Sequence, residues 1–190
     1  MNQWFERHPH LLAREQAQLA NNGNYQEHRQ ARAVFLASTG EVLVRAGGSV
    51  RRYPVLIVYP QATPFALPTV YVLSEVLGAD DLHRIVRGEE LHEEILRGKI
   101  AFHHRRHQQP NGCLCLLEPD NLDQQGALTV DANGILARVR DWLAGLTTGY
   151  FPAESAEVNL FEHYLKRYYQ FQVLLPAPFL HAAGQGGSFY

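Results

Sequence analysis

The run Tyr53-Pro-Val-Leu-Ile-Val-Tyr59 is the part of the chain that most strongly suggests a β-strand. Its β-branched and aromatic residues favour an extended backbone, and turn-forming residues lie on both sides of it. Gly47-Gly48-Ser49 precedes the run, and the segment 60–68, which contains three prolines, follows it. Because proline fixes its own backbone and restricts the residue before it, 60–68 is expected to form an ordered, extended loop and not a helix.

Three further runs have the composition of short strands, namely 33–37, 41–45 and 69–73. The triplet Ser38-Thr39-Gly40 separates the first two of these runs and is expected to be a turn. Four short strands that are joined by close turns predict an antiparallel meander.

Helical patterns lie on both sides of this expected sheet. Pro9 to Asn21 has an early proline followed by helix-forming residues, and 89–96 has apolar residues at helical spacing. The segment 131–146 has the clearest pattern, because five apolar residues fall on one face and Gly149 can end the helix. Those five residues are Ile135, Val139, Trp142, Leu143 and Leu146.

The C-terminal part is expected to contain a helix at 154–169 and a strand or extended arm at 170–175. Strands and helices that are segregated along the chain indicate an α+β fold. We therefore expect one domain over 1–175 with an insertion at about 78–106, followed by a flexible, glycine-rich tail over 176–190.

The composition is that of a soluble globular protein. The chain has 190 residues, 46% of them hydrophobic, and a formal net charge of −2. It therefore has no strong basic field to hold a nucleic acid, and no nucleic-acid partner is expected. No apolar run is long enough to span a membrane, and Met1–Arg14 lacks the pattern of a secretory signal. A cytoplasmic location is expected.

The two cysteines, Cys113 and Cys115, lie one residue apart. A disulfide between them would close a very small and strained loop. The pair is therefore interpreted as free thiols, as metal ligands, or as one reactive thiol with a bystander. A cysteine with apolar neighbours is also commonly a small, buried hydrophobic residue.

Three segments together resemble one known family. The first is Tyr53–Pro60 with Pro64-Phe65 and Leu67-Pro-Thr-Val-Tyr71 after it. The second is His107-Gln-Gln-Pro-Asn-Gly-Cys-Leu-Cys-Leu116, and the third is Trp142 on a helix that follows the cysteines. In these segments the chain resembles the ubiquitin-conjugating (E2) enzymes, most of all the bacterial E2-like proteins of antiphage operons.

The resemblance implies a ubiquitin-conjugating fold, with Cys115 as the catalytic cysteine and Cys113 at a variable position beside it. It implies that Cys115 carries a ubiquitin-like protein, or another protein with a C-terminal glycine, as a thioester and passes it to an amine. The implied partners are an E1-like activating enzyme, a ubiquitin-like protein or the C-terminus of a nucleotide cyclase, and a target protein. A JAB-type deconjugating peptidase from the same operon is a further expected partner, and no cofactor is expected.

The resemblance also suggests roles for residues on both sides of the cysteines. His107 and Asn111 match the His and Asn of the family's His-Pro-Asn segment, although the contiguous triplet here is Gln109-Pro110-Asn111. Glu118 and Asp120 lie where many members have an acidic gate.

A thiol suits this reaction because its thiolate is a strong nucleophile and its thioester stays activated. The cationic cluster 103–107 would favour the thiolate if it lay close to Cys115. The Asn111 amide, or a backbone N–H, would stabilise the oxyanion that forms on attack. Glu118 or Asp120 would orient or deprotonate the incoming amine.

Other interpretations of the same residues stay open. Asn111 also suits a simple turn, and Glu118 and Asp120 also suit solvated loop positions. The histidines of 103–107, His103, His104 and His107, are suitable zinc ligands together with the cysteines, although Cys-x-Cys lacks the usual two-residue gap. A non-catalytic E2-like binding module is a third alternative, and the presence of Cys115 argues against it.

Overall fold

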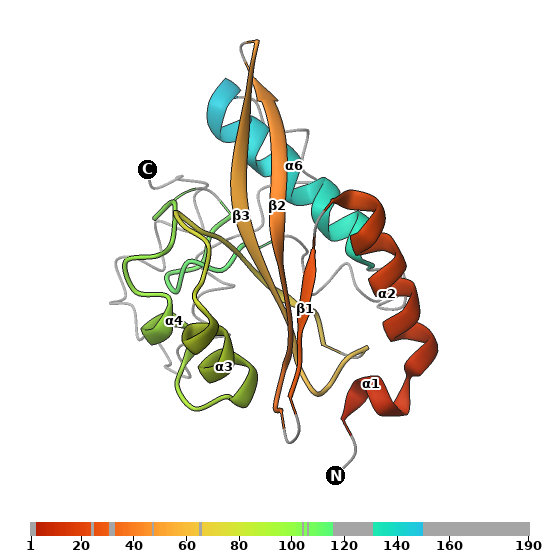
Figure 1. Cartoon of the computed structure of the whole chain (residues 1–190). Helices are drawn as coiled ribbons and strands as arrows, with labels where there is room; N and C mark the ends of the chain where they lie inside the picture. The colour runs from red at the N-terminus through yellow and green to blue at the C-terminus, as the bar shows by residue number, and fades with distance from the viewer. Residues whose placement is uncertain are drawn as a thin grey trace, which may run out of the picture. The chain divides into compact units, whose positions relative to one another are not determined.

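The computed structural model describes residues 3–23, 25–30, 33–46, 48–64, 66–103, 105, 107–115 and 131–149. Its helices and strands are α1 (Trp4–Arg7), α2 (Pro9–Asn22), β1 (Gln26–His28), β2 (Leu36–Ala46), β3 (Ser49–Tyr59), β4 (Thr69–Val72), α3 (Ala79–Arg87), α4 (His92–Ile95) and α6 (Ala132–Thr148). The four strands form one antiparallel sheet in the order β1-β2-β3-β4 (Figure 1). The expected α+β class and the four-stranded antiparallel meander are confirmed.

Several predictions for the C-terminal part lie outside the described residues. These are the helix at 154–169, the extended stretch at 170–175 and the tail at 176–190, and with them the end of the expected domain at 175.

The predicted strand at 53–59 forms the second half of β3, and its last five residues are buried. Val55 and Ile57 belong to the hydrophobic core on one face of the sheet, whereas Leu56 and Val58 belong to the core on the other face. Neighbouring side chains of a strand point to opposite faces, so a strand that is covered on both sides needs an unbroken apolar run. β3 therefore joins the two cores.

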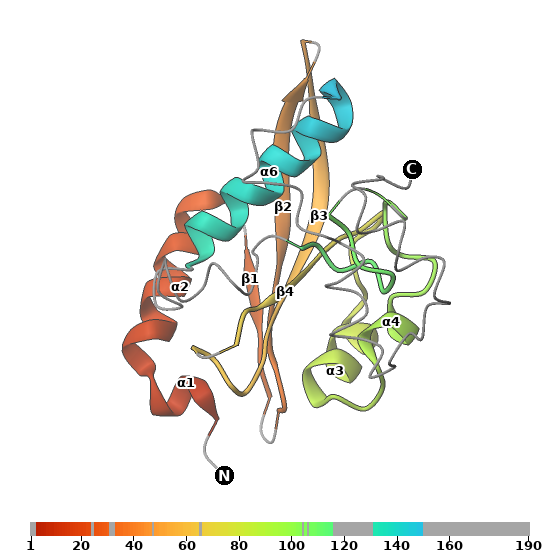
Figure 2. The ribbon, with the colours of Figure 1, turned by 180° about the vertical axis from the view of Figure 1, so that it is seen from behind.

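Helices cover both faces of the sheet. The face that holds Val55 packs against α1, α2 and α6, as Figure 2 shows from the side of α6. Trp4 of α1 and Trp142 of α6 are both buried there, so the apolar face predicted for the helix with Trp142 packs into the core. The face that holds Leu56 packs against α3 and α4 (Figure 1).

The segment 78–106, expected as an insertion, supplies this second layer of helices. The predicted helix at 89–96 is confirmed only for His92–Ile95, which is α4. The longer helix, α3, precedes it and was not predicted. α3 ends at Gly88, which adopts the left-handed conformation with a φ of +64° that favours glycine.

One predicted turn is wrong. Ser38-Thr39-Gly40 lies inside β2, which runs unbroken over Leu36–Ala46 and pairs with β3 along its whole length. The expected strand at 33–37 overlaps β2 by only its last two residues, and the first strand of the sheet is β1 instead. A Cβ on Gly40 would lie 2.5 Å from the ring of Tyr25. The glycine therefore makes room for an aromatic ring and does not reverse the chain.

The other predicted strands and turns agree with the structure. The run 41–45 is the second half of β2, and 69–73 contains β4. Ala46 pairs with Ser49 across the turn predicted at Gly47-Gly48-Ser49, where Gly48 has a φ of +79°. The described residues of 60–68 form turns without a helix.

The predicted helices at 9–21 and 131–146 are confirmed as α2 and α6. Pro9 is the first residue of α2, where its missing N–H costs nothing. Gly149 ends α6 with a φ of +73°, as the residue type predicts.

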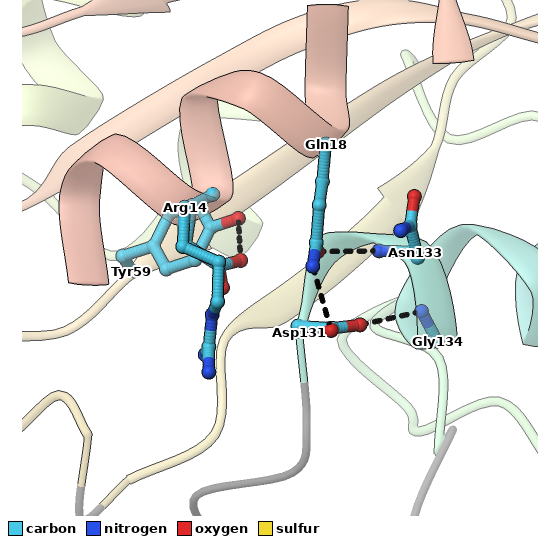
Figure 3. A network of polar contacts seen from close by, with 7 residues as sticks. Arg14, Gln18, Tyr59, Asp131, Asn133 and Gly134 are labelled. Atoms are coloured by element: carbon cyan, nitrogen blue, oxygen red, sulfur yellow. Dashed lines mark hydrogen bonds and ion pairs between the residues drawn. The ribbon is translucent and has the colours of Figure 1, made fainter. Parts of the chain in front are cut away.

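Side-chain hydrogen bonds tie the start of α6 to α2 (Figure 3). Asp131 caps α6 by accepting the Gly134 N–H at 3.0 Å, and its other oxygen accepts from Gln18 Nε2 at 2.7 Å. Gln18 Oε1 accepts the Asn133 N–H at 3.1 Å. One glutamine of α2 therefore binds both the cap and the first turn of α6, which fixes where that helix begins.

A buried carboxyl group joins α2 to the end of β3. The Tyr59 hydroxyl donates to Glu15 Oε2 at 3.2 Å, and Arg14 Nη2 donates to Glu15 Oε1 at 3.1 Å. Burial raises the pKa of Glu15 in spite of the cation beside it, because a charged carboxylate is poorly solvated there. Burial and the nearby carboxyl group raise the pKa of Tyr59 as well. α2 is thus held to the sheet by polar as well as apolar contacts.

We expect Gly40→Ala to destabilise the protein by about 1–3 kcal/mol, because the new methyl group would overlap the Tyr25 ring. Urea unfolding measures the change. Gly134→Ala is the matched control, since the nearest atom to its new Cβ lies at 3.6 Å and alanine favours a helix by up to about 1 kcal/mol. In a Tyr25→Ala background, Gly40→Ala should cost clearly less, and an unchanged cost would contradict the contact.

Candidate functional site

The outer edge of β4 is occupied by the chain that leads to and contains the cysteines. The Ala101 N–H donates to the Val72 carbonyl at 3.0 Å, and the Leu114 N–H donates to the Val70 carbonyl at 2.8 Å. An open edge strand would leave these carbonyl groups without a protein partner. The segment with Leu114 is therefore placed by the backbone of the sheet itself.

Residues 107–115 form a tight hairpin. The Gln109 N–H donates to the Cys113 carbonyl at 2.8 Å, and the Cys115 N–H donates to the His107 carbonyl at 2.7 Å. The Gly112 N–H closes the turn on the Gln109 carbonyl at 2.8 Å. Pro110-Asn111-Gly112 forms the loop, in line with the turn that Asn111 suits, and it matches a hairpin with a three-residue loop whose last residue is left-handed.

Two residues of this hairpin have a positive φ. Gly112 has a φ of +83°, and a Cβ there would lie 3.0 Å from Ile100, so both its conformation and its surroundings favour glycine. His107 has a φ of +55°, which costs an L-residue roughly 1–2 kcal/mol. The carbonyl of His107 accepts the Cys115 N–H, so the hydrogen bonds of the hairpin offset this cost.

A buried glutamine fastens the hairpin to the chain before it. Gln108 Nε2 donates to the Phe102 carbonyl at 2.6 Å and to the Gly112 carbonyl at 3.1 Å, and Gln108 Oε1 accepts the Arg105 N–H at 3.3 Å. The local sequence does not single out Gln108, because a glutamine beside a turn resembles a solvated residue. These hydrogen bonds, to residues on both sides of it in the chain, show its role.

The two cysteines have different surroundings. Cys113 is 4% exposed and belongs to the core with Leu73 and Ile100, whereas Leu114 points to the other core. Cys115 is only partly buried, and the two cysteines do not form a disulfide. The bystander position predicted for Cys113 therefore corresponds to a buried side chain, and Cys115 is the more exposed of the two residues.

Asn111 takes part in the turn through the oxygen of its side-chain amide. Asn111 Oδ1 accepts the Cys113 N–H at 3.1 Å, the bond of an Asx turn. This contact supports the structural interpretation of Asn111, and it leaves the Nδ2 group without a hydrogen bond to any described residue. The side chain is held in one orientation, and a donor remains for a ligand.

The hairpin contains three of the five residues expected in the site. One backbone hydrogen bond links Cys115 to His107, whereas Asn111 lies in the loop, where its side chain binds the Cys113 N–H. Glu118 and Asp120 lie outside the described residues. Of the expected cationic cluster, His103 and Arg105 are exposed and His107 is partly buried, while His104 and Arg106 are outside the described residues as well.

The zinc alternative gains no support from the part of the chain that is described. Within it, no three His, Cys, Asp or Glu side chains come close enough together to hold a metal ion. Likewise, none of the helices that the structure describes has both the length and the apolar character needed to cross a membrane.

Comparisons with protein-family models, with curated proteins and with solved structures find no match to this chain. The resemblance to E2 enzymes thus depends on the motifs of the sequence alone.

We expect iodoacetamide to modify Cys115 at least about tenfold faster than Cys113 in the native protein, because a buried thiol reacts only when the structure opens locally. Peptide mass spectrometry of the full chain measures both rates. After unfolding in urea the two rates should become similar, which controls for the chemistry of the flanking residues. Equal rates in the native protein would contradict the described burial.

Proposed function

We propose that the chain is an E2-type conjugating enzyme with a ubiquitin-conjugating fold, in which Cys115 carries a donor protein as a thioester. The order of elements supports this proposal: N-terminal helices, a four-stranded meander, the cysteine segment and then a helix, with α3 and α4 added between the meander and the cysteine segment. The observation that carries it is the partly exposed Cys115 at the end of a hairpin anchored on β4. A nucleophile must be reachable and still held in place, and this hairpin meets both needs.

The reaction consists of two acyl transfers. The Cys115 thiolate attacks the thioester carbonyl that joins the C-terminal glycine of the donor to a cysteine of an E1-like enzyme. The tetrahedral oxyanion collapses, the thiolate of the E1-like enzyme leaves, and the acyl group is bound to Cys115. A target amine then attacks this thioester, gives up a proton, and releases the Cys115 thiolate as the amide bond forms.

Asn111 is the oxyanion donor in this proposal. Its Oδ1 atom is engaged by the Cys113 N–H, so its rotamer is fixed and Nδ2 remains to donate to the developing negative charge. Glu118 and Asp120 are proposed to orient or deprotonate the amine, and His107 to shape the site through its contact with Cys115.

The partners follow from the same chemistry. An E1-like enzyme must supply the activated donor, which is a ubiquitin-like protein or the C-terminus of a nucleotide cyclase, and a target protein must supply the amine. A JAB-type peptidase would reverse the modification. We place this activity in the bacterial cytoplasm, in antiphage defence, on the strength of the motif resemblance.

Co-expression with the E1-like enzyme and donor from the same operon should yield a donor adduct on this chain that reducing agent removes. Non-reducing gels and intact-mass measurement detect the adduct. We expect Cys115→Ala to abolish it and Cys113→Ala to retain it, because Cys113 is buried whereas Cys115 is partly exposed. Unfolding curves of both variants control for loss of structure.

Each result of this experiment is informative. An adduct that persists in Cys115→Ala would move the nucleophile to another residue. If the E1-like enzyme carries the donor and this chain forms no adduct, the conjugating function is wrong and a partner-binding module is favoured instead.

Asn111→Asp separates the two roles of Asn111. The carboxylate can still accept the Cys113 N–H, so the unfolding midpoint should stay close to that of the wild type. The variant lacks the amide donor, so the single-turnover rate of transfer from Cys115 to an amine should fall by about 100-fold. Asn111→Ala, which loses both groups, should lower the rate and the stability. Transfer at the wild-type rate in Asn111→Asp would make Asn111 a turn residue only.

A further inference from the structure

The free end of the β2–β3 hairpin has one face that no described helix covers. α6 packs behind this hairpin, where Val42 and Val44 are buried, and Figures 1 and 2 show it on that side only. The residues that point the other way pair across the strands, Leu43 with Arg52 and Arg45 with Val50. These four residues, Leu43, Arg45, Val50 and Arg52, are called the ribbon face.

The ribbon face is both apolar and cationic. Leu43 is 51% exposed and Val50 is 55% exposed, which places two large aliphatic side chains in water next to each other. Arg52 has a long, exposed ion pair with Glu41 at 3.5 Å, while Arg45 has no acidic partner among the described residues. Exposed apolar side chains that are flanked by like charges are typical of a docking surface for an oppositely charged partner.

The same chain has a second surface of opposite charge. Leu91, directly before α4, is 63% exposed, and carboxylates lie on both sides of it. We call this surface the acidic corner; its residues are Glu89, Glu90, Leu91, Glu93 and Glu94.

The charge of the acidic corner is only partly neutralised. Arg87 pairs with Glu89 at 3.0 Å, and Arg84 pairs with Glu90. Glu93 and Glu94 have no ion-pair partner among the described residues, and both are exposed. The corner therefore presents an exposed leucine beside carboxylates that a cation of another molecule can neutralise.

We propose that the ribbon face of one chain docks against the acidic corner of a second copy. The two surfaces match in chemistry, since each has exposed aliphatic side chains and the charges have opposite signs. Both views place α4 away from the free end of the β2–β3 hairpin, so the two surfaces are separate (Figures 1 and 2). Strand alternation places the ribbon face on the same face of the sheet that packs against α3 and α4. The contact joins two unlike surfaces, one from each copy.

This association is weak and depends on salt. Two short surfaces with a few residues each bury much less than the roughly 800 Å² per partner of a standard stable interface. Exposed charge pairs are also screened by salt, so high ionic strength should dissociate the copies. The proposal does not involve Cys115, and it stands or falls independently of the conjugating activity.

Sedimentation velocity on the full chain tests the proposal. Between about 10 and about 500 µM, at low salt, the weight-average sedimentation coefficient should rise with concentration, and in about 0.5 M salt it should stay at the monomer value. Arg45→Glu and Glu93→Arg should each weaken association at least about tenfold, because each places like charges against one another. Asp141→Arg, on the exposed side of α6, is the matched control for Glu93→Arg because it changes the net charge by the same amount, and it should associate like the wild type.

Mixing the two variants gives the most specific test. In an equimolar mixture, the ribbon face of Arg45→Glu can meet the acidic corner of Glu93→Arg with the charges exchanged, and the other two surfaces are native. Association should therefore return in the mixture. A wild-type monomer at every concentration, normal association of Glu93→Arg alone, or a mixture that stays monomeric would each overturn the proposal. Loss in Arg45→Glu with no effect of Glu93→Arg would point to contact between two ribbon faces instead.

Discussion

The burial of β3 on both faces is the constraint on which the remaining structure depends. Val55 and Ile57 face one core, and Leu56 and Val58 face the other, so the strand would expose an apolar surface if either layer of helices were absent. Full burial of an aliphatic side chain is worth about 1.5–3 kcal/mol, so these four residues alone require both layers. α3 and α4 are therefore part of the minimal fold, and 78–106 is not an accessory excursion.

Local signals in the sequence predicted the elements whose structure is determined locally. The apolar run 53–59 and the helix ended by Gly149 can each be recognised from their own residues, without reference to any other part of the chain. Gly40 was wrongly predicted to form a turn. The position needs a glycine because the ring of Tyr25, fifteen positions earlier in the chain, packs against it. β1 was missed for a related reason: Gln26–His28 has a polar composition, and only its pairing with β2 makes it a strand.

The candidate site shows the same division between local and distant causes. Pro110-Asn111-Gly112 specifies its turn by residue type. Cys113 and Cys115 lie two positions apart, so alternation places both on the same side of an extended chain and does not distinguish them. Their exposure differs because Cys113 packs into the core with Leu73 and Ile100, which the local sequence does not show. The anchoring of this hairpin was not predictable, because it depends on the edge of β4 and on Gln108, whose partners are backbone carbonyls and an N–H group.

The hydrogen bond between Leu114 and Val70 also has a consequence for how the protein folds. It joins residues forty-four positions apart, and it needs β4 to be in place. Closing this loop costs chain entropy, and the contacts that offset this cost can form only after β4 has joined the meander. The position of Cys115, one residue after Leu114, therefore depends on a contact that the chain before β4 cannot supply. A chain that emerges from the ribosome would hold this thiol in its native place only after β4 and the cysteine segment had both been made.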